Sequence, residues 1–217
     1  MKEAINVEDA IAPIHDGASV MFGGFMGVGT PLRLVDEIVR QGKRELTIIG
    51  NDTARPGQAI GKLIDADCVR RVVTSHIGTN PVTQKKMIAG EIEVELVPQG
   101  TLAERIRAAG YGLGGVLTPT GLGTRAAEGK PTLDVEGRTY LLETPLRADV
   151  ALVYAHRADY NGNIDFMLTA RNFNPVMAMA AETLIVEPQF FVPVGVLPPD
   201  AVAVPGAVVD CLVRRAA

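Results

Sequence analysis

Cysteine is scarce in this sequence, with two residues in a chain of 217. Cys68 and Cys211 are far apart, and each lies in an apolar stretch. Disulfides are rare in cytosolic proteins, and free cysteine is among the most buried residue types. We therefore expect two buried free thiols. We also expect no metal site, because neither these cysteines nor the three histidines show metal-ligand spacing.

Long hydrophobic runs and blocks of one charge are also missing. No stretch approaches the roughly 18 consecutive apolar residues of a membrane-spanning helix. The first residues carry Lys2, Glu3, Glu8 and Asp9 in place of the apolar core of a signal peptide. The 21 basic and 25 acidic residues form no basic patch for a phosphate backbone. These features predict a soluble, cytoplasmic protein that binds neither nucleic acid nor membranes.

The chain has enough apolar material for one large core, since 47% of its residues are hydrophobic. One domain, residues 1–217, is the expected organisation. Short apolar segments alternate with segments of helical periodicity, which predicts an α/β fold, a mostly parallel sheet with helices on both faces. The expected strands are 18–22, 46–49, 69–74, 91–97, 150–154, 183–186 and 207–213, and the expected helices are 31–40, 57–66, 81–89, 101–109 and 174–181.

The middle of the chain departs from this alternation. Five glycines fall within residues 112–123, enough to let the backbone approach a ligand or a partner closely. Residues 132–135 and 138–142 then flank Glu136-Gly137, which predicts a small β-hairpin excursion from the main fold.

The strongest local signal is the glycine-rich turn at residues 23–31, between an expected strand and an expected helix. Thr30 suits the cap of that helix, and Pro31 suits its first position. Backbone N–H groups and the positive end of a helix dipole favour an anion there, so the turn predicts a phosphate or carboxylate site. The alternative is a tight turn whose glycines serve only close packing. A dinucleotide fingerprint is incomplete, because Leu32 stands where the third glycine belongs.

Residues 16–31 resemble the first signature of the family I coenzyme A transferases. An acidic residue and glycine are followed by apolar residues, Gly-Gly-Phe, three free positions and Gly-x-Pro. Three further blocks, residues 97–102, 117–121 and 170–175, resemble recurring blocks of the alpha subunits of that family. The segments Asn51-Asp52-Thr53 and 75–81 are most similar to the acetate/acetoacetate (butyrate/acetoacetate) type.

This resemblance implies a fold shared in outline with ribose-5-phosphate isomerase and glucosamine-6-phosphate deaminase. It implies an enzyme that moves coenzyme A between short-chain carboxylic acids by ping-pong chemistry, through a glutamyl-CoA thioester. The nucleophilic glutamate of such enzymes belongs to a Ser-Glu-Asn-Gly type block on a beta subunit, and this chain has no such block. The resemblance thus implies an α2β2 assembly, with coenzyme A as a substrate and no permanently bound cofactor.

Several side chains are candidates for the site. Gln99 follows an expected strand end, and its amide can donate to an oxyanion without adding charge; it could otherwise cap a helix that starts at Thr101. Asn51 and His76 also follow expected strands, where crevices of parallel sheets lie. His76 suits an acid/base or carboxylate-binding role, or is an ordinary loop histidine. By resemblance, Gly24, Phe25, Gly27, Val28 and Gly29 shape the pocket and offer N–H groups to the substrate carboxylate.

Two other interpretations stay open. One is a 3-oxoadipate or succinyl-type CoA-transferase alpha subunit, since one methylene changes binding by only about 1–3 kcal/mol. The other is a non-catalytic module of the same fold that binds a small acid or a phosphosugar. A phosphosugar isomerase would place a lysine near the phosphate, and residues 23–31 contain none.

Overall fold

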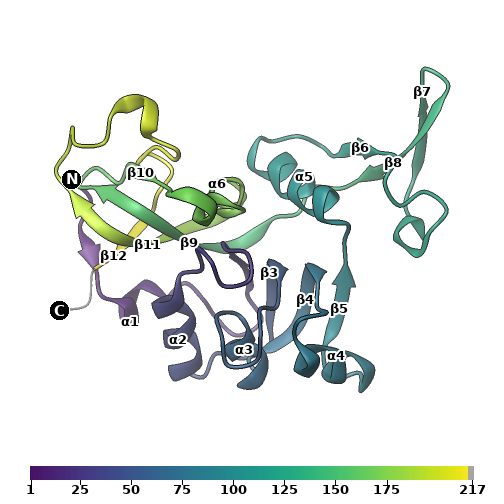
Figure 1. Ribbon diagram of the computed structural model, residues 1–217, viewed down its shortest axis with the longest axis horizontal. Coiled ribbons are helices and arrows are strands. Elements are labelled where there is room, and N and C mark those ends of the chain that lie inside the picture. Colours follow the sequence, from purple (N-terminus) through teal and green to yellow (C-terminus); the bar gives the residue numbers. More distant parts are fainter. Residues whose placement is uncertain (215–217) are drawn as a thin grey trace.

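A nine-stranded, mostly parallel sheet forms the centre of the computed structural model, which describes residues 1–214 (Figure 1). The strand order is β1-β12-β11-β9-β2-β3-β4-β5, with all these neighbours parallel, and β10 pairs antiparallel with β9. The strands are β1 (Ala4–Ile5), β2 (Ser19–Phe22), β3 (Leu46–Asp52), β4 (Val69–His76), β5 (Glu93–Leu96), β9 (Ala148–Asp159), β10 (Ile164–Asp165), β11 (Ala181–Val192) and β12 (Cys211–Val213). The predicted α/β fold class is confirmed.

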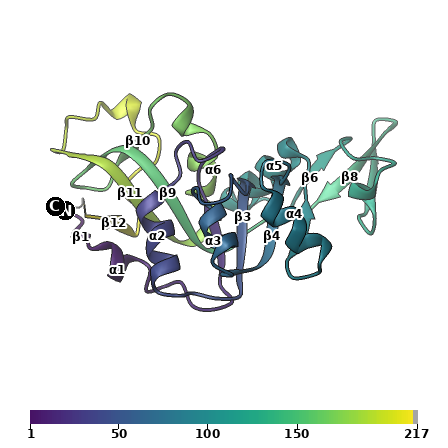
Figure 2. The same cartoon turned by 60° about the horizontal axis from the view of Figure 1, so that its bottom comes forward.

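Helices cover both faces of this sheet. Side chains alternate along β2, so that Val20 and Phe22 enter one hydrophobic core and Met21 enters the other. The first core lies under α1 (Val7–Ala10), α2 (Leu32–Arg40), α3 (Gly61–Asp65) and α4 (Pro81–Ile88), and the second lies under α5 (Gln99–Gly110) and α6 (Asn174–Met177). Figure 2 brings α2, α3 and α4 toward the viewer. Short 3-10 turns occupy Arg125–Ala127, Leu168–Arg171 and Pro199–Ala201.

The predicted hairpin belongs to an arm that projects from the body beside α5 (Figure 1). The arm is an antiparallel sheet of β6 (Val116–Thr118), β8 (Arg138–Glu143) and β7 (Thr132–Val135), in that order. Glu136 and Gly137 form the turn, both with positive φ (51° and 77°), as a tight hairpin connection requires.

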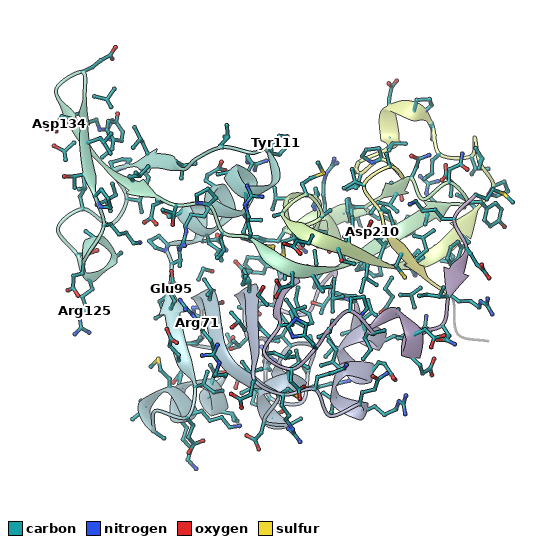
Figure 3. The ribbon with its side chains drawn as sticks, turned by 180° about the vertical axis from the view of Figure 1, so that it is seen from behind. Arg71, Glu95, Tyr111, Arg125, Asp134 and Asp210 are labelled. Carbon is teal, nitrogen blue, oxygen red and sulfur yellow. The ribbon has the colours of Figure 1, made fainter. Side chains whose placement is uncertain are left out.

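An ion network ties the arm to the body. Glu143, at the end of β8, is 1% exposed and accepts a hydrogen bond from Lys130 at 2.7 Å. Arg105, on α5, has Nε 3.8 Å from Glu143 and donates from Nη1 to Glu95 at 2.8 Å. Arg71 lies beside Glu95 (Figure 3) and bonds its other oxygen at 2.7 Å. Burial favours a raised pKa of Glu95, but the hydrogen bonds from the two arginines outweigh burial and lower it.

Several predicted boundaries were wrong. Strands β9 and β11 have 12 residues each, far more than residues 150–154 and 183–186, because each supplies the other's hydrogen bonds along their full length. Helix α3 is shorter than residues 57–66 and begins only at Gly61, because Gly57 and Ala59 have positive φ (73° and 43°), outside the helical range. The C-terminal strand covers 211–213 instead of 207–213, and β1 and β10 were not predicted.

Both cysteines are free thiols, as predicted. Cys68 is buried, whereas Cys211 is only partly buried, and burial raises the pKa of the Cys211 thiol to about 11. Within residues 1–214, no helix has the length and apolarity that crossing a membrane requires. The same residues contain no group of three or more His, Cys, Asp or Glu side chains placed to hold a metal ion.

Candidate active site at the strand ends

A cleft of about 450 Å³ opens at the carboxyl ends of β2, β3, β4 and β5, which are neighbours in the sheet. Its lining residues are Phe25, Met26, Asn51, Asp52, Ser75, His76, Thr79 and Gln99. The structure thus brings together four side chains singled out in the sequence, Phe25, Asn51, His76 and Gln99. Ligands of open parallel sheets bind at this edge, which makes the cleft the candidate active site.

Gln99 and Asn51 are hydrogen-bonded to each other at the polar end of the cleft. Gln99 Nε2 donates to Asn51 Oδ1 at 2.6 Å, and the Ser75 hydroxyl, from β4, donates to the Asn51 carbonyl at 2.7 Å. Helix α5 begins at Gln99 itself with Pro98 as its N-cap, and no side-chain hydrogen bond caps the helix. The alternative in which Gln99 caps a helix starting at Thr101 is therefore wrong.

His76 is the last residue of β4 and pairs in register with Asp52 at the end of β3. The side chain is exposed to the cleft, and its ring packs over Gly78, where a Cβ would lie 2.7 Å from the imidazole Cε1. No hydrogen bond to another described residue holds the imidazole, so both ring nitrogens are open to a ligand.

The backbone N–H groups of the glycine-rich turn are mostly used within the chain. The Gly24 N–H group donates to Asn172 Oδ1, and the Met26 N–H group donates to Asp52 Oδ2. Phe25 and Val28 donate to each other's carbonyl groups. Three of the five predicted N–H donors, those of Gly24, Phe25 and Val28, are thereby unavailable to a substrate carboxylate in this conformation. In the described part of the chain, only the N–H groups of Gly27 and Gly29 stay free in the segment 23–30.

Close packing explains two of these glycines. A Cβ on Gly24 would lie 2.1 Å from Thr30 Oγ1, and a Cβ on Gly29 would lie 2.6 Å from the Ala170 carbonyl oxygen. Both residues also have positive φ, 124° and 73°. Gly27 and Val28 instead line a neighbouring hollow of about 380 Å³, on the α2 side of the turn.

Two asparagines of the block at residues 170–175 clamp this turn. Asn172 donates to the Val28 carbonyl at 2.9 Å while accepting from Gly24 at 3.1 Å. Asn174 is fully buried, donates to the Gly29 carbonyl at 2.9 Å and accepts from the Tyr154 N–H group at 3.1 Å. The bonds from Asn172 to Val28 and Gly24, and from Asn174 to Gly29, each join segments more than a hundred residues apart, so local sequence patterns did not predict them.

The anion expected at the start of α2 is a side chain of the protein itself. Glu187, on β11, is 8% exposed and accepts from the N–H groups of Leu34 at 3.0 Å and Arg33 at 3.4 Å. Helix α2 begins at Leu32 with Pro31 as its N-cap, and neither Thr30 nor Pro31 makes a capping side-chain hydrogen bond, so the expected roles of these two residues were wrong. Glu187 therefore occupies the end of α2, and within residues 23–30 only the N–H groups of Gly27 and Gly29 remain for the predicted phosphate or carboxylate.

Comparisons with known proteins identify the family of this chain. A family model described as Coenzyme A transferase matches residues 4–215. The acetate CoA-transferase subunit alpha of Escherichia coli (strain K12) is 54% identical over 209 residues, which cover 96% of this chain and 95% of that relative. The acetoacetyl-CoA:acetate/butyrate CoA transferase alpha subunit of Clostridium acetobutylicum is 47% identical over 213 residues, 98% of each chain.

The fold likeness extends to solved structures. An acyl-CoA transferase from E. coli O157:H7, in a thioester complex with CoA, superimposes with a TM-score of 0.85 at 21% identity. The match covers 97% of this chain and 46% of that one, so this chain spans about half of the larger enzyme. The family match over nearly the whole chain confirms the resemblance first seen in residues 16–31. This chain belongs to the coenzyme A transferase family.

Proposed function

We propose that this chain is the alpha subunit of a heteromeric CoA-transferase that moves CoA between a short-chain acyl-CoA or acetyl-CoA and acetoacetate or a related short-chain acid. The named activities of the two relatives support this reaction. A glutamate of the beta subunit attacks the acyl-CoA carbonyl and expels the CoA thiolate, which then converts the acyl-glutamyl anhydride to a glutamyl-CoA thioester and releases the first acid. The second acid reverses these steps, so no resident cofactor is needed.

The observation that carries this proposal is the Gln99–Asn51 pair at the edge where four strand ends meet. Gln99 Nε2 has two hydrogens and uses one of them on Asn51 Oδ1. The second hydrogen is free to donate to the oxyanion that forms as the partner's glutamate attacks the thioester. Asn51 and His76 contact the bound acid, while Phe25 lies against its alkyl chain. Gly24, Gly27, Val28 and Gly29 shape the neighbouring wall, and Gly27 and Gly29 supply the free N–H groups.

The charge of the cleft favours acids with one carboxylate. Among its lining residues, His76 alone can carry a positive charge, and Asp52 carries a negative one. A second carboxylate, as in succinate or 3-oxoadipate, would find no arginine or lysine among those residues to offset its desolvation. Acetate, butyrate and acetoacetate avoid this cost. The succinyl and 3-oxoadipate alternatives are accordingly less well supported than the short-chain reaction.

We further propose that residues 1–217 act as one domain in an α2β2 complex in the cytoplasm, without nucleic acid or membrane partners. Relatives named alpha subunits support a beta partner, and two free thiols fit a reducing compartment.

The test is transfer of CoA from acetoacetyl-CoA to acetate by the complex co-purified with its beta subunit, beside each subunit alone. We expect ping-pong kinetics from the complex and no transfer by this chain alone. Gln99→Ala should lower kcat by about 10²–10³ with little change in KM, since one oxyanion donor is lost. Transfer of CoA by the isolated chain would contradict the proposal that the beta subunit carries the catalytic glutamate. Binding of acids by a complex that never turns over would favour the non-catalytic module.

A further inference from the structure

Asp52 is a buried carboxylate at the end of β3, hydrogen-bonded to Asn51 of the Gln99–Asn51 pair. It is 4% exposed and has no cationic partner among the described residues. Three N–H donors compensate its charge. Oδ2 accepts from the Met26 N–H group and from Asn51 Nδ2, both at 2.8 Å, and Oδ1 accepts from the Ala54 N–H group at 2.7 Å.

The polarity of this carboxylate determines how the two neighbouring amides are oriented. An ionised carboxylate only accepts hydrogen bonds, so Asn51 must turn its NH₂ group toward Asp52. Its Oδ1 then faces Gln99, which in turn must present Nε2, at 2.6 Å, and the Ser75 hydroxyl lies 3.1 Å from the same Oδ1. If Asn51 were reversed, Gln99 would present Oε1, and an oxygen lone pair would lie where an N–H group now points to the cleft.

We propose that Asp52 is a positioning residue for CoA transfer, which holds Gln99 as a hydrogen-bond donor through Asn51. The inference rests on the proposed function, because it concerns the donor role of Gln99 in that reaction. Asp52 does not need to contact the substrate. Its negative charge makes one orientation of the Asn51 amide far more stable than the other. The orientation of Asn51 in turn determines the orientation of the Gln99 amide.

Asp52 also has a local structural role that the test must separate from this one. The two backbone N–H groups it accepts from belong to Met26 and Ala54, whose φ angles are 50° and 52°, in the left-handed region that costs non-glycine residues energy. Loss of the carboxylate therefore weakens two strained turns. Asp159 offers a matched control, because it is 2% exposed and accepts from the Asn161 and Asn163 N–H groups and from Asn163 Nδ2, at 2.8–2.9 Å. It lies at the end of β9, outside the cleft.

Asp52→Asn in the co-purified complex is the central test. The new amide keeps the shape but has one acceptor atom for three donors, so Asn51 and Gln99 lose their enforced orientation. We expect single-turnover formation of the glutamyl-CoA thioester to slow by about 10²-fold, approaching the loss in Gln99→Ala, with KM changed by less than about threefold. Asp159→Asn should lower the melting temperature similarly yet change that rate by less than about threefold.

A double-mutant cycle identifies the route of the effect. If Asp52 acts through Gln99, Asp52→Asn should slow the Gln99→Ala complex by less than about a further threefold. Losses that multiply would overturn the inference and leave the proposed function intact. A wild-type complex without CoA transfer, or a Gln99→Ala complex at the wild-type rate, would overturn the donor role and this inference together.

Asn51→Ala extends the test to a variant that keeps both backbone hydrogen bonds of Asp52. The substitution removes the amide that links Asp52 to Gln99. The test can therefore be made even if the Asp52→Asn chain fails to assemble with the beta subunit. We expect a rate loss of the same order as in Asp52→Asn. Wild-type turnover in Asn51→Ala would show that Asp52 does not act through this amide.

Discussion

Glu187 caps helix α2 through the Leu34 N–H group at 3.0 Å, although 153 positions separate the two residues in the chain. Burial raises the pKa of Glu187 above its usual range, against the opposing effect of its hydrogen bonds from Leu34 and Arg33. The folded protein thus holds the proton more tightly than the unfolded chain does. Between the usual pKa and the raised one, the free energy of unfolding should fall as pH rises.

Glu187→Gln tests this relationship. The amide oxygen can still accept from Leu34, but the side chain no longer titrates. We expect the variant to gain stability relative to wild type as pH rises from about 4 to 7, measured by urea unfolding. Glu187→Ala, which loses the cap altogether, should be about 1 kcal/mol less stable than Glu187→Gln. A difference between wild type and Glu187→Gln that is constant with pH would contradict the assignment.

Gly29 and Gly27 should respond differently to a methyl group. Both have positive φ, 73° and 86°, which costs alanine about 1–2 kcal/mol in either place. A Cβ on Gly29 also collides with the Ala170 backbone at 2.6 Å, whereas the nearest atom to a Cβ on Gly27 is Ala59 Cβ at 3.6 Å. Gly29→Ala should therefore destabilise the protein clearly more than Gly27→Ala, in the same unfolding assay. Equal losses of unfolding free energy in the two variants would show that the turn moves to accommodate the methyl group, and that residues 170–175 do not hold it in place.

Turnover in the Gly27→Ala complex then reports on substrate binding. If this variant assembles and melts near the wild type, a raised KM for the acid would show that this segment of the turn contacts the substrate, since alanine keeps the backbone N–H group and adds only a methyl group. An unchanged KM would restrict the turn to packing. Larger substitutions at Gly29 are uninformative on this point, because they disturb Ala170 before they reach the cleft.

Arg105 should hold the arm to the body. Its side chain is 10% exposed and bridges Glu95 and Glu143, and its Nε donates to the Thr144 carbonyl at 2.9 Å. Arg105→Met leaves the buried Glu143 with Lys130 alone, so we expect a loss of roughly 3 kcal/mol and faster proteolysis within residues 119–131.

Arg107 is the control on the same helix. Its pair with Glu104 is half-exposed on both sides, so Arg107→Met should cost less than about 1 kcal/mol. Equal losses for the two variants would indicate that the network does not stabilise the arm beyond ordinary helix surface pairs.

The sequence alone determined the class of fold and the edge of the sheet where the candidate site lies. Alternating strand and helix patterns up to residue 109 predicted parallel β2 to β5 in the right places, because hydrophobic periodicity is a local property. Glu136-Gly137 predicted its turn for the same reason. Since parallel strands share one carboxyl edge, Asn51, His76 and Gln99 could be expected near each other before any coordinates existed.

Only the tertiary structure decided which polar groups in that region are free and which are occupied. Glu187 fills the helix end that the glycine-rich turn offered to a ligand, and Asn172 takes the Gly24 N–H group. The orientation of Gln99 follows from Asp52 through Asn51, across 48 positions of sequence between the two amides. Each N–H group can make only a limited number of hydrogen bonds. Whether a donor is free for a ligand therefore depends on every acceptor that folding brings near it, and local sequence patterns do not contain that information.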